Sequence, residues 1–480
     1  MQQLETETMT TNETKGFYKL SWLQRIGFGA GDLAQNLIYQ TICMYLLFFY
    51  TDVYVLGGDA AKSAGLAATM FLVVRLVDVL WDPLVGTFVD KHTPRWGKYR
   101  SYLVMGGIPL TILAILCFWD GFKPSIIYAY ITYVGMSMLY TLINVPYGAL
   151  NSSLTRDTDE ITVLTSTRMF MANVGGLCVS AGVPILVALL AWNDVPAKTF
   201  ETALFMGLGS LPAFIFMPLV PSIKQQIGKK NMFYVFLSVA IIGMALLYFI
   251  SKFMDMAENM WLVYVAQFIK STGVIVATGY MWALIPEVIS YGEYTTGRRI
   301  SGIVNALTGI FFKAGMALGG VIPGLVLAAT NYLPKESEGN ALPNDSNAWF
   351  LTMLIFSLVG LALLIFCFTQ TKERVVMDES ETKNVKVSDL WTEFLRNRPL
   401  RIIALFFITA FAMMSVGNAA GAYFMNGLDQ QEPLAQEGIR WLVCVIPALL
   451  LFLAMFIISK YELSDEVIDG INKEIENRNK

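Results

Sequence analysis

Apolar segments long enough to cross a lipid bilayer recur through the whole chain, and they constrain its fold more than any other feature. A transmembrane helix needs about 20 consecutive, mostly apolar residues. Backbone groups in lipid must be satisfied within the segment itself, so each such segment is predicted to be helical. We place twelve of them, at residues 26–51, 64–89, 101–119, 125–150, 167–192, 202–221, 232–251, 260–288, 301–331, 348–369, 400–425 and 438–459. The sequence therefore predicts an all-α membrane protein with twelve transmembrane helices and both ends on the same side.

The composition agrees with this prediction and excludes other classes. Of the 480 residues, 55% are hydrophobic and 15% are charged, and the mean hydropathy is +0.54. The net charge of -3 gives no sign of a nucleic-acid partner, so the expected surroundings are the lipid bilayer. The five cysteines form no C-x-x-C pair and the only histidine, His92, lies in a loop, so we expect neither a disulfide framework nor a cofactor. Because no pattern of nucleophile and base is present, we expect no enzyme.

Lysines and arginines gather in every second loop between the predicted helices. The loops that follow even-numbered helices contain Lys91, Arg95, Lys98 and Arg100, and then Arg156, Lys224, Lys229, Lys230, Arg298, Arg299, Lys372, Arg374, Lys383, Lys386, Arg396 and Arg398. The loops that follow odd-numbered helices contain about one each. By the positive-inside rule, the even loops and both termini face the cytoplasm, and we expect a plasma (inner) membrane location. The tails 1–25 and 460–480 and the long loop 371–399 are then cytoplasmic.

Two aspartates lie inside the second predicted helix. Asp78 and Asp82 are four residues apart, which puts both carboxylates on one face of the helix. Ionisable groups at membrane depth are costly and usually mark the path of an ion or a substrate. Two carboxylates one turn apart repel each other unless a proton or a metal cation lies between them. The pair predicts a site for Na⁺ or H⁺ in an ion-coupled transporter, although Asp78 could instead pair with Arg75 on the same face.

The loop after this helix has a pattern typical of one superfamily. It reads Gly86-x-x-x-Asp90-Lys-His-Thr-Pro-Arg95-Trp-Gly-Lys98-Tyr-Arg100, and a weaker copy lies at residues 218–230. The pattern resembles the cytoplasmic loop signature of the major facilitator superfamily. The resemblance implies that Asp90, Arg95, Lys98 and Arg100 are gating residues that latch helices and release them during transport. The alternative is that these bases are an ordinary positive-inside anchor.

Further motifs narrow the family. They are Phe49-Tyr-Thr-Asp52, Arg75-x-x-Asp78-x-x-x-Asp82-Pro83, Tyr140-Thr141-x-x-Asn144-x-Pro146-Tyr147, Ser290-Tyr-Gly-Glu293-Tyr and Phe312-Lys313. Together they resemble the glycoside-pentoside-hexuronide:cation symporters, whose type member is the melibiose permease. The resemblance implies the major facilitator fold of two six-helix bundles and transport of a sugar with a cation by alternating access. We expect the protein to be a monomer.

The resemblance also implies roles for individual residues. The cation site would consist of Asp78, Asp82 and Thr141. The substrate site would contain Asn36, Asn144, Arg168 and Lys313, with Trp81 and Tyr147 either stacking on the sugar or simply packing, and Glu293 would take part in gating. Lys313 lies deep in its helix, so we expect it to pair with an aspartate of the second helix, unless it is neutral or hydrated.

The substrate site departs from the type member at informative positions. Asn36 and Asn144 stand where the melibiose permease has aspartates, and Gly148 stands where it has an aromatic residue. An asparagine offers a donor and an acceptor to sugar hydroxyls, so a glycoside fits but melibiose itself becomes doubtful. A cavity that loses two acids and keeps its bases would suit a hexuronide. The alternative function is a sodium-coupled lipid or lysolipid transporter of the same fold, which would need a lateral apolar opening.

The order of the family motifs along the chain is unusual. Thr371-Lys-Glu-Arg374 follows the tenth helix and Asn397-Arg-Pro-Leu400 opens the eleventh. In the family, the run that matches the first follows helix six, and the run that matches the second precedes helix seven. The predicted order in family terms is helices 1–5, then 8–11, then 6–7, then 12. The corresponding parts are residues 26–192, 193–332, 333–428 and 429–459. Each moved block holds an even number of helices, so every helix keeps its direction in the membrane.

Overall fold

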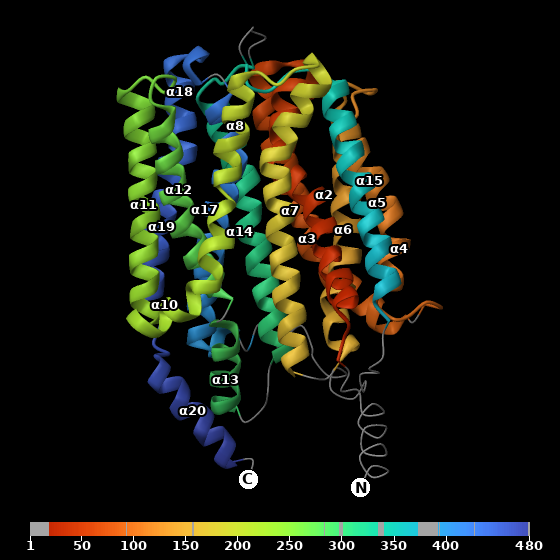
Figure 1. The fold of residues 1–480 in the computed structure, drawn as a ribbon, viewed down its shortest axis with the longest axis vertical. Coiled ribbons are helices and arrows are strands. Elements are labelled where there is room, and N and C mark those ends of the chain that lie inside the picture. The colour runs from red at the N-terminus through yellow and green to blue at the C-terminus, as the bar shows by residue number, and fades with distance from the viewer. Residues whose placement is uncertain are drawn as a thin grey trace. The chain divides into compact units, whose positions relative to one another are not determined.

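Helices form almost all of the described chain (Figure 1). The computed structural model describes residues 19–92, 94–155, 158–282, 284–296, 301–334, 340–372, 392, 394–426 and 428–478. No strand occurs within these ranges. The α-helices are α2 (Trp22–Phe48), α3 (Ala60–Lys91), α4 (Ser101–Met105), α5 (Gly107–Leu116), α6 (Ile126–Leu154), α7 (Thr158–Trp192), α8 (Ala197–Leu208), α9 (Leu211–Phe216), α10 (Val220–Ile227), α11 (Lys229–Phe253), α12 (Met260–Met281), α13 (Leu284–Thr296), α14 (Ser301–Ala329), α15 (Ser346–Gln370), α17 (Arg398–Met425), α18 (Pro433–Arg440), α19 (Ile446–Ser459) and α20 (Asp465–Arg478).

Short helices of other kinds continue several of these elements. One π-helix extends α2, and another joins α18 to α19. Three 3-10 turns lie between longer helices. The π-helices are η1 (Phe49–Val53) and η5 (Trp441–Val445), and the 3-10 turns are η2 (Leu56–Gly58), η3 (Met217–Leu219) and η4 (Leu428–Gln430).

Eleven helices among the described residues are long and apolar enough to cross a membrane. Each of them coincides with one of the predicted segments, and the chain is a multi-pass membrane protein. The exception is the third segment, predicted at 101–119, where the helix is interrupted at Gly106 between α4 and α5. The apolar helical stretch there, Ser101–Leu116, is too short to span a bilayer as a straight helix. The count of twelve spans therefore stays a prediction.

The chain divides into two compact units, and the first contains α2, the later part of α3, α4 to α7 and α15. Its ranges are Met1–Ala60, Leu76–Ala203 and Leu342–Asp378. Helix α2 is central because it packs against α7 and α15. Gly31 permits this approach, since a Cβ there would lie 2.5 Å from the Tyr147 ring and 3.0 Å from the Cys367 sulfur of α15.

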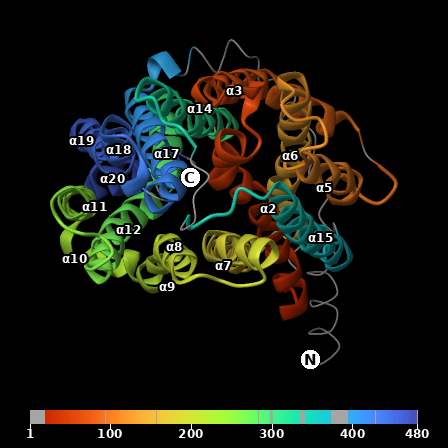
Figure 2. The ribbon, with the colours of Figure 1, turned by 90° about the horizontal axis from the view of Figure 1, so that it is seen from above.

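Helix α15 belongs to the first unit although it is the tenth predicted span. It packs against α2, α5 and α7, and Figure 2 shows it beside α2 and α5. Trp349 of α15 is fully buried among aromatic rings of the first unit, with centroids 5.8 Å from Tyr45 and Phe48 and 6.3 Å from Phe118. Its indole nitrogen donates a hydrogen bond to the Pro343 carbonyl oxygen at 2.8 Å. Aromatic burial therefore anchors α15 to the first five spans.

The second unit contains the early part of α3, the later part of α8, and α9 to α14 and α17 to α20. Its ranges are Ala61–Arg75, Leu204–Ala341 and Glu379–Lys480. Its main pairings are α14 with α17, α11 with α12, and α17 with α19. The first pairing is very close, because a Cβ on Gly319 would lie 1.9 Å from the Ser415 Cβ. Small residues at such crossings let helix backbones approach in a membrane protein.

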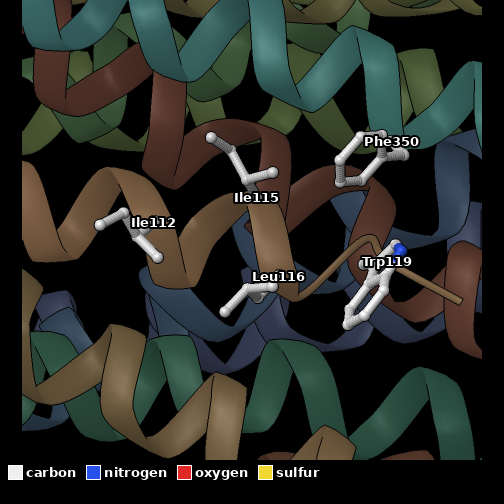
Figure 3. Close-up of a pocket in the computed structure, with 5 residues that line it drawn as sticks. All are labelled: Ile112, Ile115, Leu116, Trp119 and Phe350. Carbon is white, nitrogen blue, oxygen red and sulfur yellow. The ribbon is translucent and has the colours of Figure 1, made fainter. Parts of the chain in front are cut away.

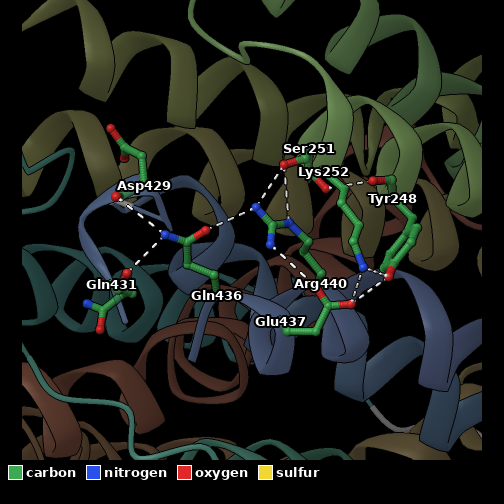
Figure 4. Close-up of polar contacts among 8 residues, drawn as sticks. All are labelled: Tyr248, Ser251, Lys252, Asp429, Gln431, Gln436, Glu437 and Arg440. Atoms are coloured by element: carbon green, nitrogen blue, oxygen red, sulfur yellow. Dashed lines mark hydrogen bonds and ion pairs between the residues drawn. The ribbon is translucent and has the colours of Figure 1, made fainter. Parts of the chain in front are cut away.

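A polar network ties α18 to α11 at one end of this unit (Figure 4). Glu437 accepts hydrogen bonds from the Tyr248 hydroxyl at 2.5 Å and from the Lys252 ammonium at 3.0 Å. Arg440 donates to the Ser251 carbonyl oxygen at 2.9 Å. Helices α13 and α20 pack together at the opposite end of the unit, where the chain ends (Figure 1).

Candidate functional site

Asp78 lies in the part of α3 that belongs to the first unit, and its side chain is bound by a serine of α6. The Asp78 side chain is buried, with 2% exposure. The Ser137 hydroxyl lies 2.7 Å from one carboxylate oxygen of Asp78 and 2.8 Å from the other. A buried carboxylate is costly unless it is hydrogen-bonded or paired, so this contact stabilises Asp78 in the membrane. The alternative pairing of Asp78 with Arg75 stays open.

Asp82 and Thr141 lie one helical turn further along α3 and α6. Asp82 is partly buried, and Thr141 is buried with 2% exposure. The Trp81 indole nitrogen donates a hydrogen bond to the Met138 carbonyl oxygen at 3.0 Å, so it joins the same two helices next to Ser137. In this conformation Trp81 fastens α3 to α6. Its predicted stacking on a sugar stays a prediction.

The two asparagines predicted to contact a sugar differ in how their amides are used. Asn36 donates to the Asp32 carbonyl oxygen at 2.9 Å and accepts from Gln40 at 3.4 Å, all within α2. Asn144 on α6 is partly buried and makes no hydrogen bond to another residue that the structure describes. One turn after it, Gly148 is exposed, and a Cβ there would meet no atom within 4 Å. The space at Gly148 is thus open, and the Asn144 amide one turn before it can take up a ligand.

Arg168 of α7 forms an ion pair with Asp32 of α2 in the first unit. The guanidinium Nε donates to one Asp32 oxygen, and the same guanidinium lies 4.8 Å from the centroid of the Tyr147 ring. Tyr147 is fully buried, donates to the Phe28 carbonyl oxygen at 2.5 Å and stacks on the Phe28 ring. Tyr147 therefore packs against Phe28 in this structure, and its predicted stacking on a sugar stays a prediction. Because Asp32 offsets the charge of Arg168, the pair adds little positive charge to the site.

Lys313 and Glu293 lie in the second unit. Lys313 is partly buried in α14, and Glu293 is partly buried in α13. Lys313 and the two aspartates of the second span belong to different units, and their predicted pairing stays a prediction. The gating role of Glu293 also stays a prediction.

The loop signature contacts the end of α15 within the first unit. Arg100 donates to the Thr371 carbonyl oxygen at 3.1 Å, and its guanidinium lies 5.0 Å from the Phe368 ring centroid. A cation at a helix C-terminus satisfies carbonyl groups that the helix leaves unpaired. The Lys98 ammonium lies 5.6 Å from the Tyr99 ring centroid, and Arg95 is exposed. The side chain of Asp90 lies outside the described residues, so its predicted part in the latch is not described.

A second charged cluster lies in the other unit. Lys229, the first residue of α11, donates to Glu287 of α13 at 2.8 Å. The Tyr461 hydroxyl donates to the same Glu287 oxygen at 2.9 Å. The cluster holds α13, the helix that carries Glu293, against the start of α11 and the segment after α19. Spacing in the sequence alone could not bring these three residues together.

One surface pocket of the first unit is apolar, unlike the polar and charged residues described above (Figure 3). It is lined by Ile112, Ile115, Leu116, Trp119 and Phe350. Aliphatic and aromatic side chains offer nothing that would orient sugar hydroxyls. They suit an acyl chain, such as that of a surrounding lipid.

Sequence reasoning missed two polar residues inside the spans. Ser137 precedes Thr141 by one turn on α6, and this spacing was the signal that could have identified it. Lys270 lies in the middle of α12 and makes no hydrogen bond or ion pair with a residue that the structure describes. Its ammonium lies 5.8 Å from the Phe205 ring centroid, a cation–π contact that sequence spacing cannot predict.

Comparison with known proteins identifies the family of this chain. The chain matches the family described as MFS/sugar transport protein in three stretches, residues 27–199, 189–343 and 337–428. The Bacillus subtilis protein named uncharacterized symporter YnaJ is 38% identical over 407 residues, which cover 67% of this chain and 86% of the relative. The Escherichia coli glucuronide carrier protein homolog is 28% identical over 405 residues, which cover 67% of this chain and 86% of the relative.

A further relative is the isoprimeverose transporter of Lactiplantibacillus pentosus. It is 25% identical over 447 residues, which cover 74% of this chain and 91% of the relative. The family match extends over most of the chain and agrees with the helical architecture. The chain therefore belongs to the MFS/sugar transport protein family, and it is a membrane transporter rather than an enzyme.

Proposed function

We propose that the protein is a cation-coupled symporter that carries a sugar, glycoside or hexuronide across the plasma (inner) membrane by alternating access. The observation that carries the proposal is Asp78, a carboxylate buried in a membrane span, with Asp82 one turn away on the same face. Such a pair gives a hard cation its preferred oxygen ligands. The names of the relatives, two of them sugar or glucuronide carriers and one a symporter, support the same function.

Helix α6 is expected to contact the substrate. Asn144 offers a donor and an acceptor to sugar hydroxyls. An aromatic side chain at position 148 would fill the space that Gly148 leaves open, and we expect a sugar ring to use this space. Asn36, Arg168 and Lys313 complete the proposed site. Because Asp32 offsets Arg168, any excess positive charge for a hexuronide carboxylate depends on Lys313.

Coupling is thermodynamic in this proposal. A cation at Asp78, Asp82 and Thr141 raises the affinity for the sugar, and the sugar raises the affinity for the cation by the same factor. The gating groups would be Glu293 and the loop residues from Asp90 to Arg100, with both termini in the cytoplasm. The protein is expected to act as a monomer.

We also propose that the chain is a family member with rewired outer loops, in the helix order 1–5, 8–11, 6–7, 12. The supporting observation is that α15 packs with α2, α5 and α7, whereas α17, the next span, packs with α14 and α19. This is the partition expected if α15 and α17 correspond to family helices six and seven.

Uptake into proteoliposomes tests the function. Purified protein is reconstituted and offered radiolabelled glycosides, pentosides and glucuronides under an imposed Na⁺ or H⁺ gradient. Accumulation of one sugar under one gradient is expected and would identify both ligands. Correctly inserted protein that transports no sugar but moves a labelled lysolipid would replace the proposal with the lipid alternative, to which the apolar pocket on α5 and α15 would then be relevant.

A further inference from the structure

Ser137, which belongs to none of the sequence motifs, contacts Asp78. Its hydroxyl lies within hydrogen-bond distance of both Asp78 oxygens, at 2.7 and 2.8 Å. Both side chains are buried, with exposures of 3% for Ser137 and 2% for Asp78. A hydroxyl has a single hydrogen, which the two carboxylate oxygens share in this geometry. The carboxylate is therefore held from the side of α6 in a fixed orientation.

The register of α3 and α6 extends this contact into a ladder. The two helices run in the same direction, because the segment just before α3 lies beside the segment just before α6, where the Gly57 amide donates to the Pro124 carbonyl oxygen at 3.1 Å. Ser137 contacts Asp78, and the next residue, Met138, accepts the hydrogen bond from Trp81. One turn further along both helices come Asp82 and Thr141. From this register we expect Thr141 to stand to Asp82 as Ser137 stands to Asp78, so that each carboxylate has a hydroxyl on the facing helix.

The chemistry of this ladder favours a metal cation over a proton. A proton shared by two carboxylates needs no further ligand, whereas a hard cation such as sodium requires several oxygens around it. A serine hydroxyl can rotate, so it can donate to the carboxylate in an empty site and turn its lone pairs toward a bound cation. The cluster of Asp78, Ser137, Asp82 and Thr141 supplies carboxylate and hydroxyl oxygens from two helices that are already fastened together.

We propose, on the basis of the symport function above, that Ser137 is a ligand of the cation site and that the coupling ion is sodium. In the empty site Ser137 positions the Asp78 carboxylate. In the loaded site its oxygen joins the sodium coordination. Removing the hydroxyl should then weaken sodium binding without weakening the binding of sugar in the absence of sodium.

The experiment measures sodium binding directly. The melting temperature of the purified full-length protein is recorded against NaCl concentration at constant ionic strength, with choline as the replacement cation, because a ligand that binds the folded state raises its stability. Ser137→Ala should raise the half-saturating sodium concentration about tenfold. Ser137→Thr, which keeps a hydroxyl, should stay within about twofold of the unaltered protein. If Ser137→Ala does not fold, Ser137→Cys takes its place, because a thiol has a similar size but is a weak ligand for a hard cation.

A matched serine on the same helix is the control. Ser153 of α6 is also buried, but its hydroxyl contacts the Leu150 carbonyl oxygen at 3.0 Å within its own helix. Ser153→Ala should leave the sodium dependence unchanged. Equal sodium affinity in Ser137→Ala and Ser153→Ala would overturn the proposal.

The proposal and the symport function can fail separately. Unaltered protein that melts at the same temperature with and without sodium, and that accumulates sugar under a proton gradient, would overturn the sodium assignment and leave symport intact. Protein that accumulates no sugar under either gradient would overturn the function on which the proposal rests.

Discussion

At the scale of single residues, charge compensation decides what the candidate site can bind. Asp32 pairs with Arg168 and offsets its charge, whereas the neutral Ser137 hydroxyl binds Asp78 and leaves its negative charge in place. The candidate site is therefore less positive than its bases alone would make it. The amide of Asn144 beside the open space at Gly148 becomes the clearest feature for a neutral, hydroxyl-rich ligand.

The paired aspartates carry the most direct prediction at this scale. Asp78→Asn or Asp82→Asn should abolish sugar accumulation driven by an ion gradient, because one carboxylate leaves an incomplete oxygen set for the cation. Exchange of labelled for unlabelled sugar at equilibrium should persist, since it needs no net cation movement. Both are measured in the same proteoliposomes.

The control for these variants makes the same chemical change elsewhere. Asp194 is exposed between α7 and α8, so Asp194→Asn should accumulate sugar like the unaltered protein. Accumulation that survives in both Asp78→Asn and Asp82→Asn would show that the cation binds at another place.

At the scale of elements, close helix crossings support the arrangement of the second unit. Gly319→Val should lower the melting temperature clearly, because a Cβ at Gly319 meets the Ser415 Cβ at 1.9 Å and α14 must move away from α17. Overpacking of this kind typically costs about 1–3 kcal/mol. The matched control is Gly309→Val on the same helix, where a Cβ meets no atom within 4 Å. Equal melting temperatures for the two variants would mean that the α14–α17 crossing is wider than described.

Sequence patterns predicted most elements because span length and hydropathy are local properties. Eleven predicted spans coincide with described helices, and the positions of Asp78 and Asp82 on one face of a span follow from helical spacing alone. The break at Gly106 was missed because Gly106 lies inside a continuous apolar run. The spacing of Ser137 from Thr141 could mark it as a candidate but could not identify Asp78 as its partner. The Asp32–Arg168 pair likewise depends on which helices become neighbours, and so did the choice between packing and stacking for Tyr147.

At the scale of the whole molecule, the helix order is the unusual property. The partition of α15 and α17 between the two units fits a chain in which whole helix pairs have changed place. Because each moved block enters and leaves the membrane on one side, the same packing can form with different outer connections. The aromatic burial of Trp349 would guide α15 to α2 regardless of its place in the chain.

A full-length protein with its helices in the family order tests whether the same packing forms with different outer connections. Joining residues 1–192, 333–428, 193–332 and 429–480 in that sequence, with short polar linkers, restores the family order. The reordered protein should fold and transport the same sugar with the same cation dependence. A scrambled control, with 333–428 moved to the N-terminus, should not transport. Loss of transport in both chains, despite normal membrane insertion, would contradict the proposed correspondence of helices.

The measurement that tests the central claim most directly is sugar accumulation in proteoliposomes that carry an inward sodium gradient. The account predicts that labelled sugar rises above its external concentration, that a sodium ionophore collapses this excess, and that an outward gradient drives the sugar out. Sugar that only equilibrates across the membrane, at a rate and level independent of both the inward and the outward sodium gradient, would contradict sodium-coupled symport.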